Sequence, residues 1–321
     1  MGVFMIKTRI RDFVISKDDW ILSVVEYDNR NGINCMLRYV PDPKGERVKD
    51  NNGKRYKKFD FDEAISFIKS KKPEYLVGDI LLISEKDVKT LLKPEERLKD
   101  ATNKSEELRL LVNLLIKEGV REDCMGITGS RLVGLQNDDS DIDFVVYGNE
   151  WYKARDRIIK LKKQREINEI DEDTWRFIYN KRRPEISFNE FIIHEKRKEN
   201  RGLINNRYFD LLYVRSWDEI KDIYLPIQKR KICRKKIEST VIGDKYAFDS
   251  PAIYELDKKD EGVDMVVSFT HTYVGQCFKG ERIEASGVLE YWDDKKILVV
   301  GTTREARGEY IRSLSLLEDI R

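Results

Sequence analysis

The sequence has few of the side chains that bind zinc or form disulfide bonds. Its 321 residues include only four cysteines and two histidines, and no two cysteines stand in a Cys-x-x-Cys pair. A zinc site is therefore not expected. The four cysteines are far apart in the sequence, and we expect reduced, buried thiols.

Long apolar runs are also absent. No stretch approaches the roughly 18 apolar residues that a membrane-spanning helix needs, and the mean hydropathy is −0.60. The N-terminus, Met-Gly-Val-Phe-Met-Ile-Lys-Thr-Arg, becomes charged too early for a signal peptide. We therefore expect a cytoplasmic protein with no membrane partner. Because the net charge is only +2, any binding of nucleic acid must depend on local basic runs.

Residues 126–148 carry the clearest chemical pattern. Gly129-Ser130 is predicted to be a tight turn after a short strand, and Arg131 to Leu135 a short helix whose first amides can bind an anion such as phosphate. A second strand is predicted to begin at Asp141-Ile142-Asp143. Residues i and i+2 of a strand share a face, so the two aspartates are expected about 7 Å apart on one side. Paired carboxylates suit hard divalent cations such as magnesium.

The spacing of these residues resembles a known signature. A Gly-Ser pair, ten further residues and Asp-hydrophobic-Asp on a strand are typical of the DNA polymerase β-type nucleotidyltransferase superfamily. The fuller pattern Gly129-Ser130-Arg131-x-x-Gly134…Ser140-Asp141-Ile142-Asp143 is similar to the minimal nucleotidyltransferases of that superfamily. The resemblance covers about residues 105–215.

The resemblance implies a set of roles for these residues. Asp141 and Asp143 would hold two magnesium ions. Gly129 and Ser130 would hold the triphosphate of an NTP, and Arg131 would neutralise phosphate charge or, alternatively, form a salt bridge within the domain. The alternative for the whole motif is a plain turn with two solvated aspartates.

In the resembled family, a third acidic residue on a neighbouring strand completes the metal site. We assign this role to Asp210, a lone carboxylate in an otherwise apolar predicted strand, because a buried unpaired charge costs several kcal/mol. The alternatives are Glu185 or Glu190 as the third ligand, and an ion pair of Asp210 with Arg207 or Arg215.

The order of predicted elements favours an α+β protein of three domains. A β-rich accessory domain is expected over 1–100 and a nucleotidyltransferase domain, with a mixed sheet and helices, over 101–236. The short, evenly spaced strands of 237–321 suggest a small antiparallel β-barrel of OB type.

Several local predictions accompany this division. Residues 20–27 and 33–40 should form a hairpin around an Asn-Gly turn, and 94–104 should be a linker. Helices should begin at caps Asp62, Ser84 and Ser105, and others should lie over 151–166 and around 175–179. Strands should lie over 74–83, 186–194, 207–214, 265–271, 282–291, 296–302 and 310–313.

Two basic runs could contact phosphates, or could be a solvated loop and a solvated connector. The first surrounds Tyr56 and contains Arg47, Lys49, Lys54, Arg55, Lys57 and Lys58. The second, stronger one contains Lys229, Arg230, Lys231, Arg234, Lys235 and Lys236.

These patterns together predict a magnesium-dependent enzyme that transfers a nucleoside monophosphate from an NTP to a hydroxyl acceptor and releases pyrophosphate. The basic runs favour an RNA or other nucleic-acid 3′ end as the acceptor. The alternatives are nucleotidylation of a protein or small molecule, and a binding module without turnover.

Overall fold

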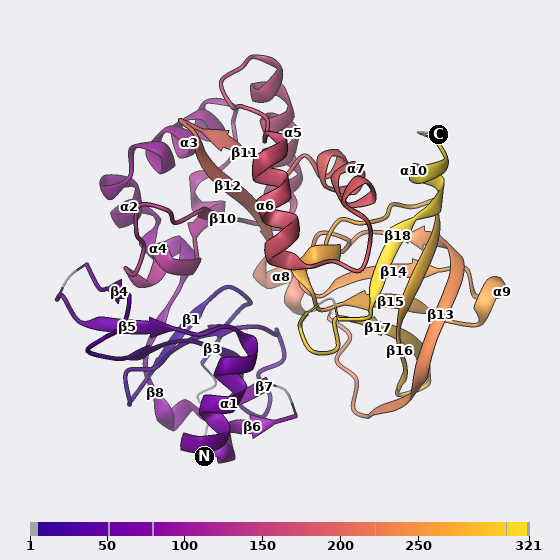
Figure 1. The fold of residues 1–321 in the computed structure, drawn as a ribbon, viewed down its shortest axis with the longest axis horizontal. Coiled ribbons are helices and arrows are strands. Elements are labelled where there is room, and N and C mark those ends of the chain that lie inside the picture. Colours follow the sequence, from indigo (N-terminus) through magenta and orange to yellow (C-terminus); the bar gives the residue numbers. More distant parts are fainter. Residues whose placement is uncertain (1–5, 51, 79, 222, 306, 320–321) are drawn as a thin grey trace. The chain divides into compact units, whose positions relative to one another are not determined.

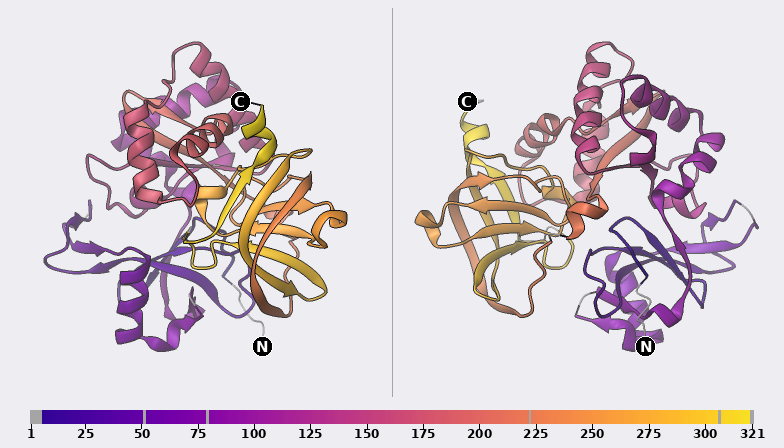
Figure 2. Two further views of the ribbon diagram at one scale, coloured as in Figure 1. Left: turned by 45° about the vertical axis from the view of Figure 1, so that its right-hand side comes forward. Right: turned by 180° about the vertical axis from the view of Figure 1, so that it is seen from behind.

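A computed structural model describes residues 6–50, 52–78, 80–221, 223–305 and 307–319. The chain forms two compact units (Figure 1, Figure 2), one made of Met1–Asn168 with Gly202–Lys221, the other of Glu169–Arg201 with Asp222–Arg321. Helices and separate sheets occur side by side in the described residues, which confirms the mixed α+β class. The three predicted domain boundaries remain a prediction. No helix in the described part of the chain has both the length and the apolar composition needed to cross a membrane.

The first unit begins with a sheet of short strands in the order β4-β5-β3-β2-β1-β8, to which β7 and then β6 are added at β3. The predicted hairpin is confirmed, because β2 and β3 pair antiparallel. The strands and helices of this region are β1 (Phe13–Ser16), β2 (Ile21–Val24), β3 (Ile33–Pro41), β4 (Arg47–Val48), β5 (Arg55–Lys58), α1 (Phe61–Lys71), η1 (Pro73–Tyr75), β6 (Leu76–Val77), β7 (Ile80–Ile83), η2 (Glu85–Asp87) and β8 (Val88–Leu92).

Both faces of this N-terminal sheet are covered. Val14 packs into a core that includes residues of α1, while its neighbours Phe13 and Ile15 point to the opposite face. That second face packs against Leu132 and Leu135, which lie in and just after the short helix of the Gly-Ser motif, α4 (Gly129–Val133). The N-terminal sheet is thus the support on which the motif helix rests.

Three local predictions in this region are wrong. The cap of α1 is Asp60 rather than Asp62, and it forms a capping box with Glu63. No α-helix follows Ser84, because one 3₁₀ turn leads directly into β8, which pairs antiparallel with β1. The strand expected over 74–83 is instead a 3₁₀ turn followed by the paired strands β6 and β7.

The expected linker over 94–104 is a helix, α2 (Pro94–Lys104). Its sequence is highly charged, which hid the pattern, but Pro94 stands at the first helical turn with Glu95 and Glu96, and Lys104 stands in the last turn. These positions suit proline and complement the helix dipole. Pro94 and Leu98 supply the buried face.

The motif strands belong to a mixed sheet in the order β11-β12-β10-β9. β10 runs parallel to β12 and antiparallel to β9, and α5 lies against β10 and β12. The helices capped by Ser105 and over 151–166 are confirmed as α3 and α5. The remaining elements of the unit are α3 (Glu106–Lys117), η3 (Glu122–Cys124), β9 (Met125–Ile127), β10 (Ile142–Tyr147), α5 (Asn149–Lys163), β11 (Arg201–Ile204), β12 (Arg207–Val214) and α8 (Trp217–Lys221).

The second unit contains helices and a six-stranded sheet in the order β13-β14-β15-β17-β16-β18, with a further pairing between β13 and β16. The strands predicted from residue 265 onward are confirmed, although β15 ends earlier than expected. The elements are α6 (Glu172–Arg182), α7 (Phe188–Lys198), β13 (Lys229–Gly243), β14 (Ala252–Leu256), α9 (Lys258–Glu261), β15 (Met265–Ser268), η4 (His271–Tyr273), β16 (Arg282–Trp292), β17 (Lys295–Val300), β18 (Tyr310–Ser313) and α10 (Leu314–Glu318).

The prediction of a strand over residues 186–194 is wrong. They fall mostly in α7, which begins with a capping box between Ser187 and Glu190. Phe191, His194 and Lys198 are buried at helical spacing. The Ser-x-x-Glu sequence was the signal that should have outweighed the run of aromatic and β-branched residues.

His194 is buried, and both of its ring nitrogens lie within hydrogen-bonding distance of backbone groups. Its Nδ1 lies 2.7 Å from the carbonyl oxygen of Glu190, and its Nε2 accepts a hydrogen bond of 2.9 Å from the Ser313 amide. An imidazole that accepts at Nε2 must be neutral there. Burial lowers the pKa of His194 to about 4, and the charges of Arg197 and Lys198 act in the same direction.

We expect the free energy of unfolding to fall as the pH is lowered from about 6.5 to 4, because the unfolded chain then binds a proton that the folded chain rejects. The loss attributable to His194 is up to about 3 kcal/mol at about 1.4 kcal/mol per pH unit. Urea unfolding at pH 7 and pH 4.5 measures it. His194→Gln should flatten this dependence, and an unchanged pH slope in the variant would assign it to other groups.

Candidate active site

The Gly-Ser turn lies directly against one of the motif carboxylates. Gly129 is the first residue of α4 and has φ +66°. A Cβ atom added to it would lie 2.1 Å from Oδ2 of Asp143, which is far inside van der Waals contact. Only glycine allows the turn and the carboxylate to approach this closely.

The three aspartates come from two neighbouring parallel strands. Asp143 on β10 stands directly opposite Asp210 on β12, so their backbones are separated by about 4.8 Å, the ordinary strand spacing. Asp141 precedes β10 and, two residues before Asp143, is expected on the same face. Asp210 is 4% exposed. The sheet therefore places Asp143 and Asp210 next to each other, and Asp141 lies just before the first of these strands.

The site concentrates negative charge. Burial raises the pKa of the Asp143 carboxyl, and Asp210 and Asp141 raise it as well, while Arg11 and Arg38 act in the opposite direction. A bound divalent cation would reduce the repulsion between these carboxylates. Because magnesium prefers carboxylate oxygens as ligands, the donor set fits magnesium. In the part of the chain that the structure describes, no three acidic, histidine or cysteine side chains already surround one point.

Ser130 and Arg131 follow Gly129 in α4. The Ser130 carbonyl accepts the amide of Leu135 at 2.9 Å, and among the described residues none hydrogen-bonds to its hydroxyl. The half-buried Arg131 guanidinium donates to the carbonyl oxygens of Ser140 and Asp141 at 3.3 and 3.2 Å. Arg131 thus stabilises the loop that leads to Asp141. Among the described residues, it does not form the salt bridge that was considered from the sequence.

The alternative third ligands have other partners. The Glu185 carboxylate accepts the Gly308 amide at 2.8 Å. Glu190 caps α7 and lies 2.7 Å from Arg312. Arg207, considered as an ion-pair partner of Asp210, donates to the carbonyl oxygen of Asp138. The assignment of the third position to Asp210 remains a prediction, as does its alternative, an ion pair with Arg215.

Two arginines of the N-terminal sheet region have charges that act on the site and were not identified from the sequence. Arg11 and Arg38 are the cations whose charges act on Asp143. The Arg11 carbonyl accepts the Thr128 hydroxyl at 2.7 Å, immediately before the Gly-Ser turn, and Arg11 itself has φ +73°. No local pattern signals this approach, because it depends on the packing of residues more than a hundred positions apart.

Comparisons with known proteins agree with this geometry. A family model described as a nucleotidyltransferase domain matches residues 115–201, which include Asp141 and Asp143 but not Asp210. Over 336 residues the chain is 40% identical to a Methanocaldococcus jannaschii protein named "Uncharacterized protein MJ1086", and the match covers 95% of this chain and 99% of that protein. No solved structure matches the chain.

The fold and the match define a protein with a nucleotidyltransferase core of the polymerase β type, as the motif predicted. The chain belongs to the same family as the archaeal protein, along essentially its whole length.

Proposed function

We propose that this protein is a magnesium-dependent nucleotidyltransferase that transfers a nucleoside monophosphate from an NTP to a hydroxyl, most simply the 3′ end of an RNA. The observation that carries the proposal is the pairing of Asp143 with Asp210 across β10 and β12. The Gly-Ser turn lies so close to Asp143 that a Cβ atom on Gly129 would clash with its carboxylate. The nucleotidyltransferase match supports the reaction class.

Asp141, Asp143 and Asp210 would hold the magnesium ions. When bound, the ions would supply charge stabilisation for the transferring phosphoryl group and a lower pKa for the attacking hydroxyl. The chain itself positions the substrate: Gly129 leaves room for a phosphate beside the carboxylates, and Ser130 offers a hydroxyl. Arg131 holds Asp141 in place through the carbonyl oxygens of the preceding loop. Most of the rate enhancement would come from this fixed arrangement of charge.

For the C-terminal sheet, we propose a small barrel of OB type. The support lies in the pairings, because β13 pairs with β14, β14 with β15, β15 with β17, β17 with β16, and β16 again with β13. The β15–β17 pair is parallel, so the expectation of a wholly antiparallel sheet is wrong. Five strands that pair in a cycle have no free edge among them. Barrels of this type bind oligonucleotides on a strand face and its adjoining loops.

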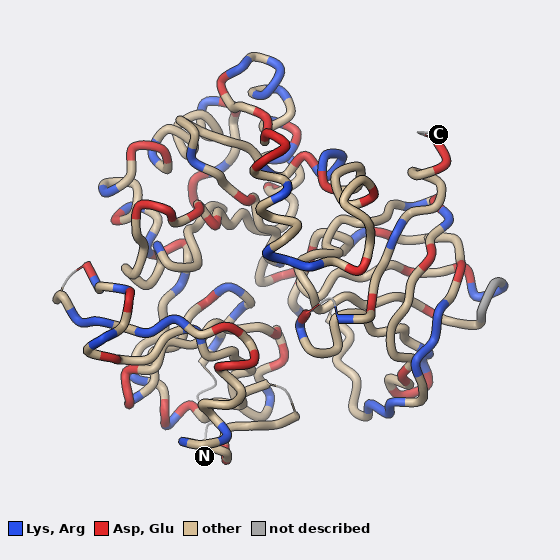
Figure 3. The backbone as a smooth tube through the Cα atoms, in the orientation of Figure 1, with Lys and Arg blue, Asp and Glu red and all other residues tan. Residues whose placement is uncertain are grey.

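The second basic run forms the exposed beginning of β13 (Figure 3). Lys229 lies 4.4 Å from the centroid of the Trp292 ring, and Arg230 lies 5.3 Å from that of Tyr291. Proteins that bind single-stranded nucleic acids use cations to contact the backbone and aromatic rings to stack on the bases. Further along, Arg234 and Lys236 are partly neutralised by Glu309 and Glu284. We therefore place the strongest phosphate contacts at 229–231.

The double variant Lys229→Gln/Lys231→Gln should weaken RNA binding and its salt dependence together. Each lost contact to a single strand removes about 0.7 from the slope of log affinity against log salt, so the slope should fall by roughly 1.4. Fluorescence anisotropy with a labelled 12-nucleotide RNA between 50 and 300 mM salt measures it. Lys69→Gln/Lys71→Gln on α1 is the matched control. Equal slopes for wild type and the β13 variant would remove this surface from the proposal.

The acceptor is tested by incubating the protein with magnesium, each α-labelled NTP in turn, and total cellular RNA. Label on RNA, absent with Asp141→Ala, would establish transfer to RNA and name the base. Label on protein or on a small molecule would replace RNA as the acceptor. Absence of label from all three fractions, with every NTP, would contradict the proposed function.

A further inference from the structure

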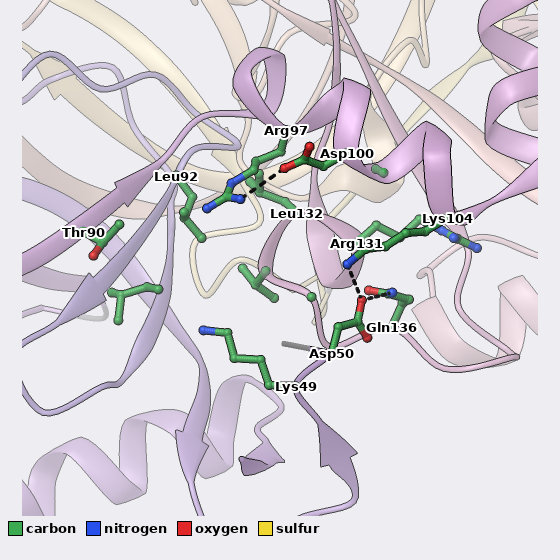
Figure 4. Close-up of a pocket in the computed structure, with 14 residues that line it drawn as sticks. Lys49, Asp50, Thr90, Leu92, Arg97, Asp100, Lys104, Arg131, Leu132 and Gln136 are labelled. Atoms are coloured by element: carbon green, nitrogen blue, oxygen red, sulfur yellow. Dashed lines mark hydrogen bonds and ion pairs between the residues drawn. The ribbon is translucent and has the colours of Figure 1, made fainter. Parts of the chain in front are cut away.

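A pocket lies beside α4, between the N-terminal sheet and α2. Its volume is about 290 Å³, which is at the lower end of the range for small-molecule sites. Figure 4 shows side chains from the β4–β5 loop, β8, α2 and α4 converging on it. The lining residues that matter to the argument are Lys49, Asp50, Arg97, Lys104, Arg131 and Gln136.

The lining carries more positive than negative charge. Lys49, Arg97, Lys104 and Arg131 face two carboxylates, Asp50 and Asp100. Asp100 lies 3.5 Å from Arg97, and Asp50 lies 3.2 Å from Lys104. Two cations therefore remain after these pairs are formed.

Lys49 is the cation best placed for a ligand. It makes no ion pair with any residue in the described ranges, and its nearest aromatic contact is the Tyr56 ring at 5.8 Å. Burial lowers the pKa of Lys49, the charge of Asp19 raises it, and the charges of Lys54, Lys89 and Arg97 lower it further. A half-buried ammonium group that has no ion-pair partner among the described residues is stabilised by a bound anion.

The pocket also has an apolar wall, and a buried amide oxygen lies near it. Ile15, Leu92, Leu132 and Val133 line one part of it. Gln136 donates its side-chain amide to Asp50 at 2.7 Å, but its Oε1 is buried and accepts no hydrogen bond within the described part of the chain. A buried acceptor without a donor costs about 1–3 kcal/mol.

We infer that this pocket binds one nucleotide-sized ligand, with a phosphate on Lys49 and the other cations of the lining and a flat apolar part on the Ile15–Leu132 wall. It is a site separate from the Asp141, Asp143 and Asp210 cluster. Arg131 joins the two, because it lines the pocket and holds the carbonyl oxygen of Asp141. Occupancy of the pocket would therefore fix the loop that carries Asp141.

The test is isothermal titration calorimetry of the full chain with each ribonucleoside 5′-monophosphate in EDTA, where the carboxylate cluster holds no metal. At least one monophosphate should bind the wild type. Lys49→Gln should weaken this binding at least tenfold. Lys104→Gln, which changes the part of the lining that α2 supplies, should weaken it as well. Lys69→Gln on the exposed surface of α1 and Asp143→Asn should bind as the wild type does.

A tetranucleotide without a 5′-phosphate separates the two sources of such a ligand. Binding that depends on Lys49 and competes with the monophosphate would identify the end of a nucleic acid, while failure to compete would identify a free nucleotide. The inference is overturned if neither probe binds, if Lys49→Gln binds as tightly as the wild type, or if Asp143→Asn abolishes binding. Because the readout needs no turnover, failure of the proposed transfer reaction would leave this result unaffected.

Discussion

Asp143→Asn should lower the rate of nucleotidyl transfer by on the order of 10³-fold or more, since it removes a charged oxygen from the centre of the proposed metal site. The asparagine has the same shape. It also lacks the charge that burial and the neighbouring carboxylates disfavour at this position, so the unfolding temperature should not fall. Single-turnover transfer of an α-labelled NTP and calorimetric unfolding measure the two quantities.

The matched control for Asp143→Asn is Asp139→Asn, in the exposed turn before β10. It changes the charge of the protein equally and should keep the rate within a few-fold of wild type. If Asp143→Asn transferred at a similar rate to Asp139→Asn, Asp143 could not be a metal ligand in the reaction.

Gly129→Ala should be nearly as damaging, for a steric reason. The new Cβ would lie 2.1 Å from Oδ2 of Asp143, so the carboxylate or the turn must move. A displacement of about 1 Å at a catalytic group can cost about 10²-fold in rate. The left-handed backbone at φ +66° adds a strain of roughly 1 kcal/mol for alanine. We expect a transfer rate about 10²-fold lower and a modest fall in unfolding temperature.

Gly134→Ala separates these two effects. Gly134 ends the same short helix with φ +70°, but the nearest atom to an added Cβ is 4.0 Å away. It should show the modest loss of stability without the loss of rate. Equal losses of rate in both variants would mean that backbone strain in α4, rather than contact with Asp143, explains the result.

The sequence was most informative where one residue type is required by local geometry. Gly129, Asp141 and Asp143 were recognised because their spacing encodes a turn and a strand face, and Ser105 because a cap needs only its own helix. The helix at 94–104 was not predicted, because its many charged residues obscured a buried face of only two residues. The strand predicted over 186–194 was wrong because residue propensity was preferred to the Ser187–Glu190 capping box.

Other features could not be predicted in this way, because they arise from contacts between distant segments. Arg11 reaches the Gly-Ser turn through the Thr128 hydroxyl, and Leu132 rests on the N-terminal sheet. The pocket beside α4 is built from β8, α2 and a loop of the first basic run. Lys49 was noted in that run as a possible phosphate contact, but the residues that converge with it were not visible before the fold was known.

The central claim, that Asp141, Asp143 and Asp210 form a divalent metal site beside the Gly-Ser turn, is tested most directly by manganese binding. Electron paramagnetic resonance can count Mn²⁺ ions bound in the presence of a non-hydrolysable NTP analogue, without any knowledge of the acceptor. We predict two ions on the wild type and at least tenfold weaker binding by Asp143→Asn. An equal number of ions bound with equal affinity by the variant would contradict the account.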